Sequence, residues 1–252
     1  MPPESRVSFK DHFSRQAAAY GRFRPRYPDL LIDHVAALAP DRRLAIDCAA
    51  GSGQAAIPLA DRFDAVLALD ASLSQLRQAR PRPAMYRVAA LAERLPVAAA
   101  SASLVVVAQA LHWFDFERFH QECRRVLVPG GVLAVWTYET FRIEPEVDRR
   151  VGRFYYGTLG PCWPAERRHV EDGYRSIPFP WRELPAPQFT LEEDWGLDEF
   201  LGYVSSWSAV QRYRDANDDD PLVALRAALE PLWPPGTQKR VSWPIQLRLG
   251  RR

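Results

Sequence analysis

The stretch Arg43-Leu-Ala-Ile-Asp47-Cys-Ala-Ala-Gly51-Ser-Gly53-Gln54 decides the fold. A short apolar run ends in an acid, continues as a turn of small residues, and leads into an apolar pattern suited to a helix. This order predicts a buried parallel strand, a tight loop and a helix whose N-terminus faces a ligand. Gly51 and Gly53 lack a Cβ, so a ligand can lie against the backbone and unusual φ values cost little.

A second acid, Asp70, stands at the end of the next apolar run, residues 65–69. An acid about 20 residues after a glycine turn is where a nucleoside ribose presents its hydroxyls. The two stretches therefore predict a nucleoside-containing cofactor without saying which one. Since burying an acid at a strand tip is costly unless it is paired, we expect Asp47 and Asp70 each to have a ligand or backbone partner.

Size and composition narrow the class of protein. The 252 residues, 47% hydrophobic, suffice for one large α/β domain or a domain with an inserted cap. The net charge is +2 with acids interspersed among the arginines, so we expect no nucleic-acid partner. We also expect a cytoplasmic protein without a membrane partner, because no segment suits a membrane span or signal peptide. The spacing of Cys48, Cys123 and Cys162 predicts neither a disulfide nor a metal site.

Four strand–helix alternations after residue 43 predict a right-handed, doubly wound sheet. Amphipathic patterns indicate helices before it, over residues 8–21 and from Pro28 to about Pro40. Later patterns indicate helices over 197–214 and 221–232 and a last strand over 241–249, whereas residues 139–189 carry no clear pattern. We expect one structural domain with these parts: N-terminal lid helices (1–42), a cofactor-binding core (43–138), a cap and substrate region with later sheet elements (139–240), and the last strand and tail (241–252).

Two cofactors compete at the glycine turn. Gly51, Gly53 and Ala56 match the G-x-G-x-x-A pattern of nicotinamide and flavin dinucleotide enzymes. S-adenosylmethionine is the rival, because Asp47 stands where a carboxylate can meet its cationic methionine end. Helices precede the first strand, whereas dinucleotide domains usually open on it, and the first helix carries aromatics that could close over a small cofactor.

The chain resembles the class I S-adenosylmethionine-dependent methyltransferases, and among them most closely the trans-aconitate methyltransferase-like group. The matching motifs follow one another in the right order over roughly residues 9–138, and a later helix extends the likeness. They are Phe13…Tyr20…Arg24-Pro-Arg-Tyr27-Pro28, Asp47-Cys-Ala-Ala-Gly51-Ser-Gly53-Gln54, Leu69-Asp70-Ala71-Ser72, Ala92-Glu93-Arg94-Leu95-Pro96, Ala108-Gln109-Ala-Leu-His112-Trp113-Phe114, Arg125-Val-Leu-Val-Pro-Gly-Gly131 and Tyr203-Val-Ser-Ser-Trp207-Ser208.

This resemblance implies an α/β fold: a doubly wound, seven-stranded, mostly parallel sheet whose last strand is reversed, with N-terminal lid helices and a helical cap insertion. It implies that the loop from Asp47 to Gly53 holds the methionine and ribose parts of the cofactor and that Asp70 binds the ribose hydroxyls. Ala49 stands where family loops often have their first glycine, and its methyl narrows the approach. The implied cofactor-binding residues are Tyr20, Asp47, Ala49, Gly51, Gly53, Asp70, Ala71, Ala92, Glu93 and Gln109.

Methyl transfer needs the nucleophile, methyl and sulfur held in line, which can remove roughly 7–11 kcal/mol of barrier. A carboxylate or phenolate acceptor would need a cationic anchor, for which Arg24 is the candidate. A neutral hydroxyl would need a general base, for which His112 is the candidate. We expect the acceptor pocket to lie under a cap made of residues 139–190 and 197–214. Its candidate substrate-binding residues are Arg24, Tyr27, His112, Trp113, Tyr203 and Trp207, and Trp163 could join them.

The sequence thus predicts a methyltransferase that moves the methyl of S-adenosylmethionine to a small-molecule acceptor, with oxygen, as carboxylate or hydroxyl, the favoured atom. The D/N-P-P-Y/F signature of enzymes that methylate base amines is absent after the fourth strand, which argues against a DNA adenine target. The alternatives are an NAD(P)-dependent oxidoreductase and a non-catalytic methyltransferase-like binding module. A monomer or a homodimer is expected.

Overall fold

One large sheet organises the computed structural model, which describes residues 25–138 and 140–252. Strands pair in the order β3-β2-β1-β4-β5-β8-β6, and β7 pairs with β8 beside this path. The first five strands are parallel, whereas β8 is antiparallel to β5, β6 and β7. The strands are β1 (Leu44–Cys48), β2 (Ala65–Asp70), β3 (Met85–Ala89), β4 (Ala102–Ala108), β5 (Leu127–Tyr138), β6 (Arg182–Leu184), β7 (Phe189–Trp195) and β8 (Lys239–Arg251).

Helices pack on both faces of the parallel strands, and two separate hydrophobic cores result. Successive strand residues point to opposite faces, so Ala45 lies in the core with Leu31 of α2, and Ile46 lies in the core with Phe119 of α5. The lid predicted over 1–42 is described only from residue 25 on, and there α2 buries its apolar face against the sheet. These helices are α2 (Asp29–Leu38), α3 (Ala56–Leu59), α4 (Leu73–Gln78) and α5 (Phe116–Val126).

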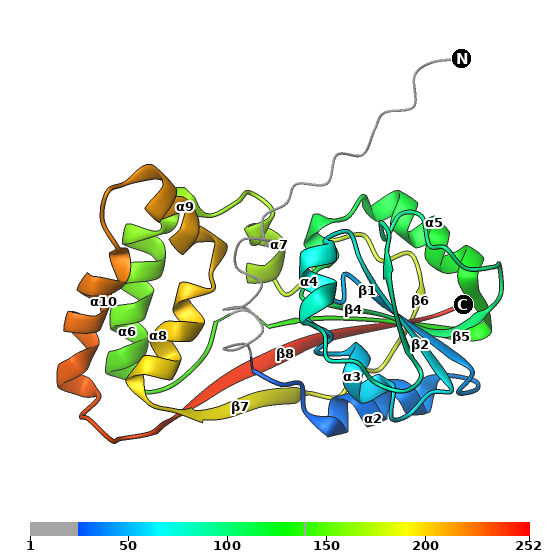
Figure 1. Cartoon of the computed structure of the whole chain (residues 1–252), viewed down its shortest axis with the longest axis horizontal. Helices are drawn as coiled ribbons and strands as arrows, with labels where there is room; N and C mark the ends of the chain where they lie inside the picture. Colours follow the sequence, from blue (N-terminus) through cyan, green and yellow to red (C-terminus); the bar gives the residue numbers. More distant parts are fainter. Residues whose placement is uncertain (1–24, 139) are drawn as a thin grey trace, which may run out of the picture.

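A helical cap stands at one end of the sheet. Figure 1 shows α6, α8, α9 and α10 gathered together, with the long strands β7 and β8 running from them to the rest of the sheet. Within the cap, α7 lies nearest to the parallel strands (Figure 1). The cap elements are α6 (Pro145–Arg153) with its π-helical extension (Phe154–Thr158), α7 (Arg167–Glu171), α8 (Leu197–Ser205), α9 (Ser208–Ala216) and α10 (Pro221–Leu229).

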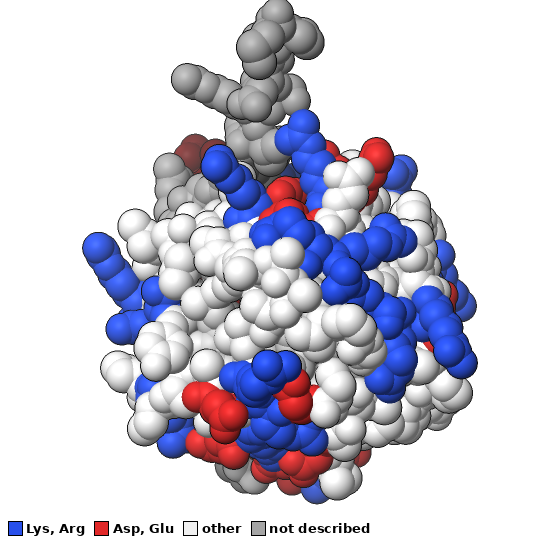
Figure 2. Space-filling view, turned by 90° about the vertical axis from the view of Figure 1, so that its right-hand side faces the viewer, with Lys and Arg blue, Asp and Glu red and all other residues white. Residues whose placement is uncertain are grey.

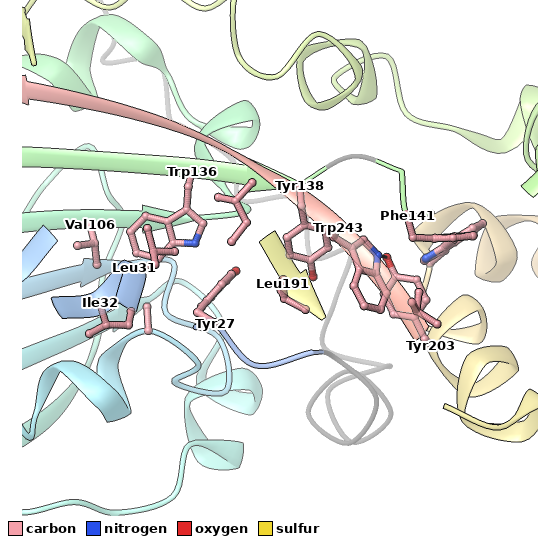
Figure 3. Close-up of a cluster of buried hydrophobic side chains, with 14 of the residues drawn as sticks. Tyr27, Leu31, Ile32, Val106, Trp136, Tyr138, Phe141, Leu191, Tyr203 and Trp243 are labelled. Carbon is pink, nitrogen blue, oxygen red and sulfur yellow. Dashed lines mark hydrogen bonds between the residues drawn. The ribbon is translucent and has the colours of Figure 1, made fainter. Parts of the chain in front are cut away.

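Buried aromatic side chains join the sheet to the cap in a continuous row (Figure 3). Tyr27 packs edge-on against Trp136 with ring centroids 5.3 Å apart. Further along, the ring of Trp243 on β8 lies 6.3 Å from Tyr138 and 5.3 Å from Tyr203 of α8. Because all five side chains are buried, this row fixes where the cap sits over the sheet.

The structure confirms the doubly wound, mostly parallel sheet and corrects the strand number, since the described residues form a sheet of eight strands where the resemblance implied seven. The segment from Phe189 to Trp195 forms β7 on the flank of β8, in register from Phe189↔Ile245 to Trp195↔Lys239. Its side chains alternate between more buried and exposed, with Leu191 fully buried. That period of two is the sequence signal for the extra strand.

The helix predicted over 197–214 is two helices, because the chain turns at Ser206 and Trp207. Ser205 Oγ donates to the Gly202 carbonyl and Ser206 Oγ to the Tyr203 carbonyl, both at 2.6 Å. Trp207 then takes an extended conformation, with ψ 136°. Such local bonds compete with the helical pattern and end α8. The turn places the Trp207 side chain inside the cap.

Charge is unevenly spread over the surface although the net charge is only +2. Figure 2 shows one face on which acidic and basic side chains mix at the bottom, while basic side chains predominate toward the right-hand edge. The near-neutral total thus conceals a local excess of arginine. In the described part of the chain, the helices are too short or too polar to cross a membrane.

Candidate functional site

Asp47 and Asp70 lie at the same edge of the sheet, because β1 and β2 are parallel and in register at Asp47↔Ala68 and Cys48↔Leu69. Asp70 Oδ2 accepts from the Gly51 N–H at 2.9 Å, and its Oδ1 accepts from the Ser72 N–H at 2.7 Å. The carboxyl group therefore ties the glycine loop to the start of α4. Each oxygen of a carboxylate has two lone pairs, so one hydrogen bond to an oxygen does not exhaust its capacity as an acceptor.

The loop after β1 runs through left-handed backbone at three positions. Ala49 has φ 55°, Gly51 φ 54° and Gly53 φ 83°. Among the described residues, a Cβ on Gly51 would meet only Gln75 Oε1, at 3.8 Å, whereas one on Gly53 would press on Ala79 at 3.1 Å. Gly53 is thus required by packing, and Gly51 leaves a bare stretch of backbone of the kind that a ligand can approach.

Asp47 is a buried carboxyl group, with 1% of its surface exposed. Within the described residues neither of its oxygens has a hydrogen-bond partner of ordinary geometry. Burial raises the pKa of the Asp47 carboxyl to about 8, the N–H of Ala56 opposes this, and the negative charge of Asp70 adds to it. A buried, unsatisfied acid is costly to the fold, and a cationic ligand would remove that cost.

The chain after β3 brings two further predicted cofactor residues to this edge. The Ala90 N–H donates to the Asp70 carbonyl at 3.1 Å, which joins this segment to the end of β2. Ala92 is buried, and Glu93 Oε1 accepts from the Asp115 N–H at 2.9 Å. Ala71, also predicted, follows Asp70 directly and is half-buried. The structure thus gathers at the carboxyl ends of the parallel strands the predicted cofactor residues that it describes, with Gln109 directly after the neighbouring strand β4.

Gln109 follows β4 directly and is held rigidly in left-handed backbone, at φ 57°. Its N–H donates to the Trp136 carbonyl at 2.9 Å and its Nε2 donates to the Tyr138 carbonyl at 2.8 Å. The Thr137 hydroxyl donates to Gln109 Oε1. These bonds fix the side chain between the ends of β4 and β5.

His112 lies on the single 3₁₀ turn Leu111–Trp113 that follows Gln109. Its Nδ1 lies 3.0 Å from the hydroxyl of Tyr174. Burial lowers the pKa of His112 to about 3, and the positive charges of Arg167 and His169 push it the same way. Burial also holds the pKa of Tyr174 above its usual range. At neutral pH the pair is therefore a neutral imidazole bonded to a neutral phenol.

A cavity of about 120 Å³ begins at Gln109 and His112 and extends into the cap. Three predicted substrate residues besides His112 line it: Trp113 from the 3₁₀ turn, Tyr203 from α8 and Trp207 from the turn after α8. Trp163 lines it as well. The other lining residues are Tyr138, Thr140, Phe141, Asp148, Val151, Gly152, Tyr155, Tyr156, Pro164, Arg167 and Ser208.

Tyr27 does not line this cavity in the described structure, since its ring packs against Trp136 in the core. A contact of Tyr27 with substrate stays a prediction. Tyr20 and Arg24 lie outside the described residues, and their roles stay predictions. Sequence reasoning missed Tyr174, Tyr155 and Arg167, which lie in the segment without a clear pattern; its mixture of aromatic residues and arginines was the available signal.

Comparisons with known proteins agree with this geometry. A family model described as a methyltransferase domain matches residues 46–135. A Dictyostelium discoideum protein assigned to the methyltransferases is 32% identical, over 90% of this chain and 88% of the relative. A solved structure assigned to a type II methyltransferase of Anaeromyxobacter dehalogenans is 47% identical with a TM-score of 0.84, over 91% of this chain and 98% of that one.

A Saccharomyces cerevisiae protein named as an S-adenosylmethionine-dependent methyltransferase is 28% identical, over 64% of this chain and 58% of the relative. These matches give no support to the oxidoreductase or the non-catalytic alternative. Identity above 30% over most of both chains, joined to the doubly wound sheet and its glycine loop, shows the family. The chain belongs to the class I S-adenosylmethionine-dependent methyltransferases.

Proposed function

We propose that this enzyme methylates the carboxylate oxygen of a small-molecule acid, with S-adenosylmethionine as the donor. One observation carries the proposal: a cavity lined by aromatic side chains starts at Gln109 and His112, at the carboxyl end of β4. Ligands of open α/β sheets bind at this edge, beside the Asp47–Asp70 pair. The resemblance to the trans-aconitate methyltransferase-like group supports an acid as acceptor.

The residues at the ends of β1 and β2 fit the donor. Asp47 offers a buried carboxyl group without a partner among the described residues, which suits the ammonium of the methionine part. Asp70 offers acceptor oxygens for the ribose hydroxyls, and Gly51 offers bare backbone beside it. When bound, S-adenosylmethionine would supply an electrophilic methyl carbon. A lone pair of the acceptor oxygen would form the new bond to this carbon, while the carbon–sulfur bond breaks and its electron pair stays on sulfur.

The state of His112 favours an acceptor that is already ionised. A neutral hydroxyl would have to lose its proton, and a buried imidazole with a pKa of about 3 is a poor base for it. A carboxylate, with an ordinary pKa near 4, needs no base at neutral pH. His112 then contributes a neutral ring nitrogen: Tyr174 occupies Nδ1, which leaves Nε2 for the cavity.

The other residues of the site would position the acceptor and exclude water. Gln109, held by three hydrogen bonds, and Trp113 define the end of the cavity nearest the donor loop. Aromatic rings of the cap close the other end. Holding an acceptor oxygen in line with the transferred carbon is the main source of rate in such a displacement.

Turnover of methyl-labelled S-adenosylmethionine with a panel of carboxylic acids, phenols and amines tests the proposal. We expect labelled products from which mild alkali releases the label as methanol. Methyl esters release methanol under these conditions, whereas aryl methyl ethers do not. At saturating donor, the rate should stay flat between about pH 6 and 8, because the acceptor stays ionised there. Label confined to phenols or amines, or a rate rising tenfold per pH unit, would contradict carboxylate methylation.

A further inference from the structure

Arg167 is a cation at the wall of the cavity, at the first position of α7. Its Nε donates to the Tyr155 hydroxyl at 2.7 Å, and that hydroxyl donates to Glu171 Oε1 at 2.9 Å. Arg167 and Glu171 are four residues apart on one helix, a spacing that usually gives a direct ion pair. Here the Tyr155 hydroxyl stands between them, so the charge of Arg167 is not neutralised by direct contact with Glu171.

The terminal nitrogens of Arg167 have no hydrogen-bond or ion-pair partner among residues 25–138 and 140–252. Arg125, which lies away from the cavity, shows the contrast: its guanidinium bonds Glu122 and two backbone carbonyls. A guanidinium carries five donors, and only the one on Nε is used in Arg167. Four donors in a planar fork are therefore available to a ligand in the cavity.

Two aromatic rings hold this guanidinium in place. Its carbon lies 4.8 Å from the ring centroid of Trp163 and 5.6 Å from that of Tyr155. Stacking of this kind, with the Nε bond to Tyr155, fixes the plane of the fork before a ligand arrives. Little side-chain entropy then remains to be lost on binding.

The rest of the wall suits a flat, apolar group. Trp163 and Trp207 lie with ring centroids 5.8 Å apart, and the ring of Phe141 stacks on Trp207 at 6.4 Å with planes 28° apart. Tyr155 meets Trp207 edge-on at 5.6 Å. Faces and edges of aromatic rings at these distances also pack well against the ring of a ligand.

The balance of charge in the cavity favours an anion. His112 is neutral and close enough to feel the positive charge of Arg167. The one acid among the lining residues described, Asp148, accepts from the Ile143 N–H at 2.9 Å, and burial raises the pKa of its carboxyl group. Arg167 is thus the charged group that an acidic ligand can pair with.

We infer that Arg167 binds the carboxylate of an aromatic acid, whose ring lies among Trp163, Trp207 and Phe141; the inference rests on the proposed carboxylate methylation. The carboxylate loses its charge as the methyl ester forms, so its pairing with Arg167 is strongest before the reaction. Arg167 therefore acts as a binding and positioning residue. Removing it should raise the acceptor KM more than it lowers kcat. The neutral ester should leave readily.

Calorimetric titration tests this inference without turnover. Four proteins are compared: the wild type, Arg167→Gln, Arg167→Lys and Arg168→Gln. Each is saturated with S-adenosylhomocysteine and then titrated with benzoate, phenylacetate and cinnamate, and with the primary amide of each acid. Arg168 is the matched control, since it is the next residue on α7 and exposed. We expect at least one acid to bind ten or more times tighter than its amide. Arg167→Gln should abolish that preference, Arg167→Lys should restore it in part, and Arg168→Gln should leave it unchanged.

Equal affinity for acids and amides in the wild type, an unchanged preference in Arg167→Gln, or no binding of any probe would overturn the inference. Binding of S-adenosylhomocysteine, measured first in every variant, separates the two proposals. If it binds normally while the acids show no preference, only the assignment of Arg167 and the aromatic acid fails. If the wild type does not bind it, the proposed methyl transfer itself fails.

Discussion

The donor end and the acceptor end of this site are built in different ways. At the donor end, Asp70 is placed by two backbone N–H groups, from Gly51 after β1 and from Ser72 just after β2, within two consecutive strands and the turns that follow them. At the acceptor end, Arg167 is placed by the side chains of Tyr155 and Trp163, which stand on another segment of the cap. A backbone-built site tolerates little change in its loop, whereas a side-chain-built pocket can change its ligand by single substitutions.

The largest effect is expected at the donor end, from Asp70→Ala. Two charge-assisted hydrogen bonds to the ribose, worth about 1.5–3 kcal/mol each, would be lost, so we expect the Kd for S-adenosylhomocysteine to rise by at least about 100-fold. The loop would also lose its ties to Gly51 and Ser72. Calorimetry measures the Kd, with Asp64→Ala, an exposed acid before β2, as the control. An unchanged Kd in Asp70→Ala would rule out the ribose contact.

Asp47 should make the free enzyme less stable as the pH rises. Its folded pKa, about 8, lies above the ordinary value of 3.8, so the folded state holds a proton that the unfolded chain releases. The contribution of this bound proton to the free energy of unfolding is full below about pH 4. It is lost as the pH rises to 8, by at most about 1.4 kcal/mol per pH unit.

Asp47→Asn removes this titration. Urea unfolding at several pH values between 5 and 8 should show a flatter pH dependence and a higher free energy of unfolding near pH 8 in this variant. Parallel pH profiles for the variant and the wild type would show that Asp47 ionises normally and has a partner.

At the acceptor end, Trp163→Ala should raise the acceptor KM by roughly tenfold, because a cation–π contact worth about 0.5–2 kcal/mol holds Arg167. The Kd for S-adenosylhomocysteine should change less than twofold, since Trp163 is not at the strand ends. The matched control is Trp181→Ala. The guanidinium carbon of Arg124 lies 5.1 Å from the centroid of the Trp181 ring, and Trp181 does not line the cavity. Equal effects of the two variants on KM would show a general loss of packing.

The smallest effect is expected from Ala49→Gly. A residue with a Cβ at φ 55° costs about 1–2 kcal/mol, and glycine loses about 0.4–1 kcal/mol through the entropy of the unfolded chain, so the net gain is at most about 1.6 kcal/mol. Differential scanning calorimetry should show a rise in Tm of a few degrees at most. Ala100→Gly, at φ 50° away from the site, should match it in Tm without altering cofactor affinity. A lower Tm in Ala49→Gly would mean that the alanine methyl stabilises the loop.

The donor end was predictable because its signals are local in the chain. The acid before the small-residue turn, the two glycines and Asp70 all lie within one strand–loop–strand unit, and the parallel register brings them together. Most of the sheet follows from the same alternation of apolar runs and helices. Ser72 and Asp115 are local signals of the same kind, because each is of a residue type that caps helices and accepts a backbone N–H three residues ahead.

The acceptor end was only partly predictable, because its contacts join residues far apart in sequence. Trp207 and Tyr203 could be proposed from a helical pattern, but the partnership of His112 with Tyr174 spans 62 residues. The residues next to Arg167 in the sequence do not predict that the Tyr155 hydroxyl lies between Arg167 and Glu171. β7, in contrast, carried a readable period of two that the proline-rich surroundings obscured.

Proton release on donor binding tests most directly whether Asp47 receives the cationic end of the cofactor. S-adenosylhomocysteine, whose ammonium matches that of the donor, is titrated at pH 7 in two buffers of different ionisation enthalpy, with the wild type and Asp47→Asn. The carboxyl group, with a pKa of about 8, should lose its proton when the ammonium arrives, so the wild type should release close to one proton and the variant none. Identical heats in both buffers for the wild type would contradict the assignment.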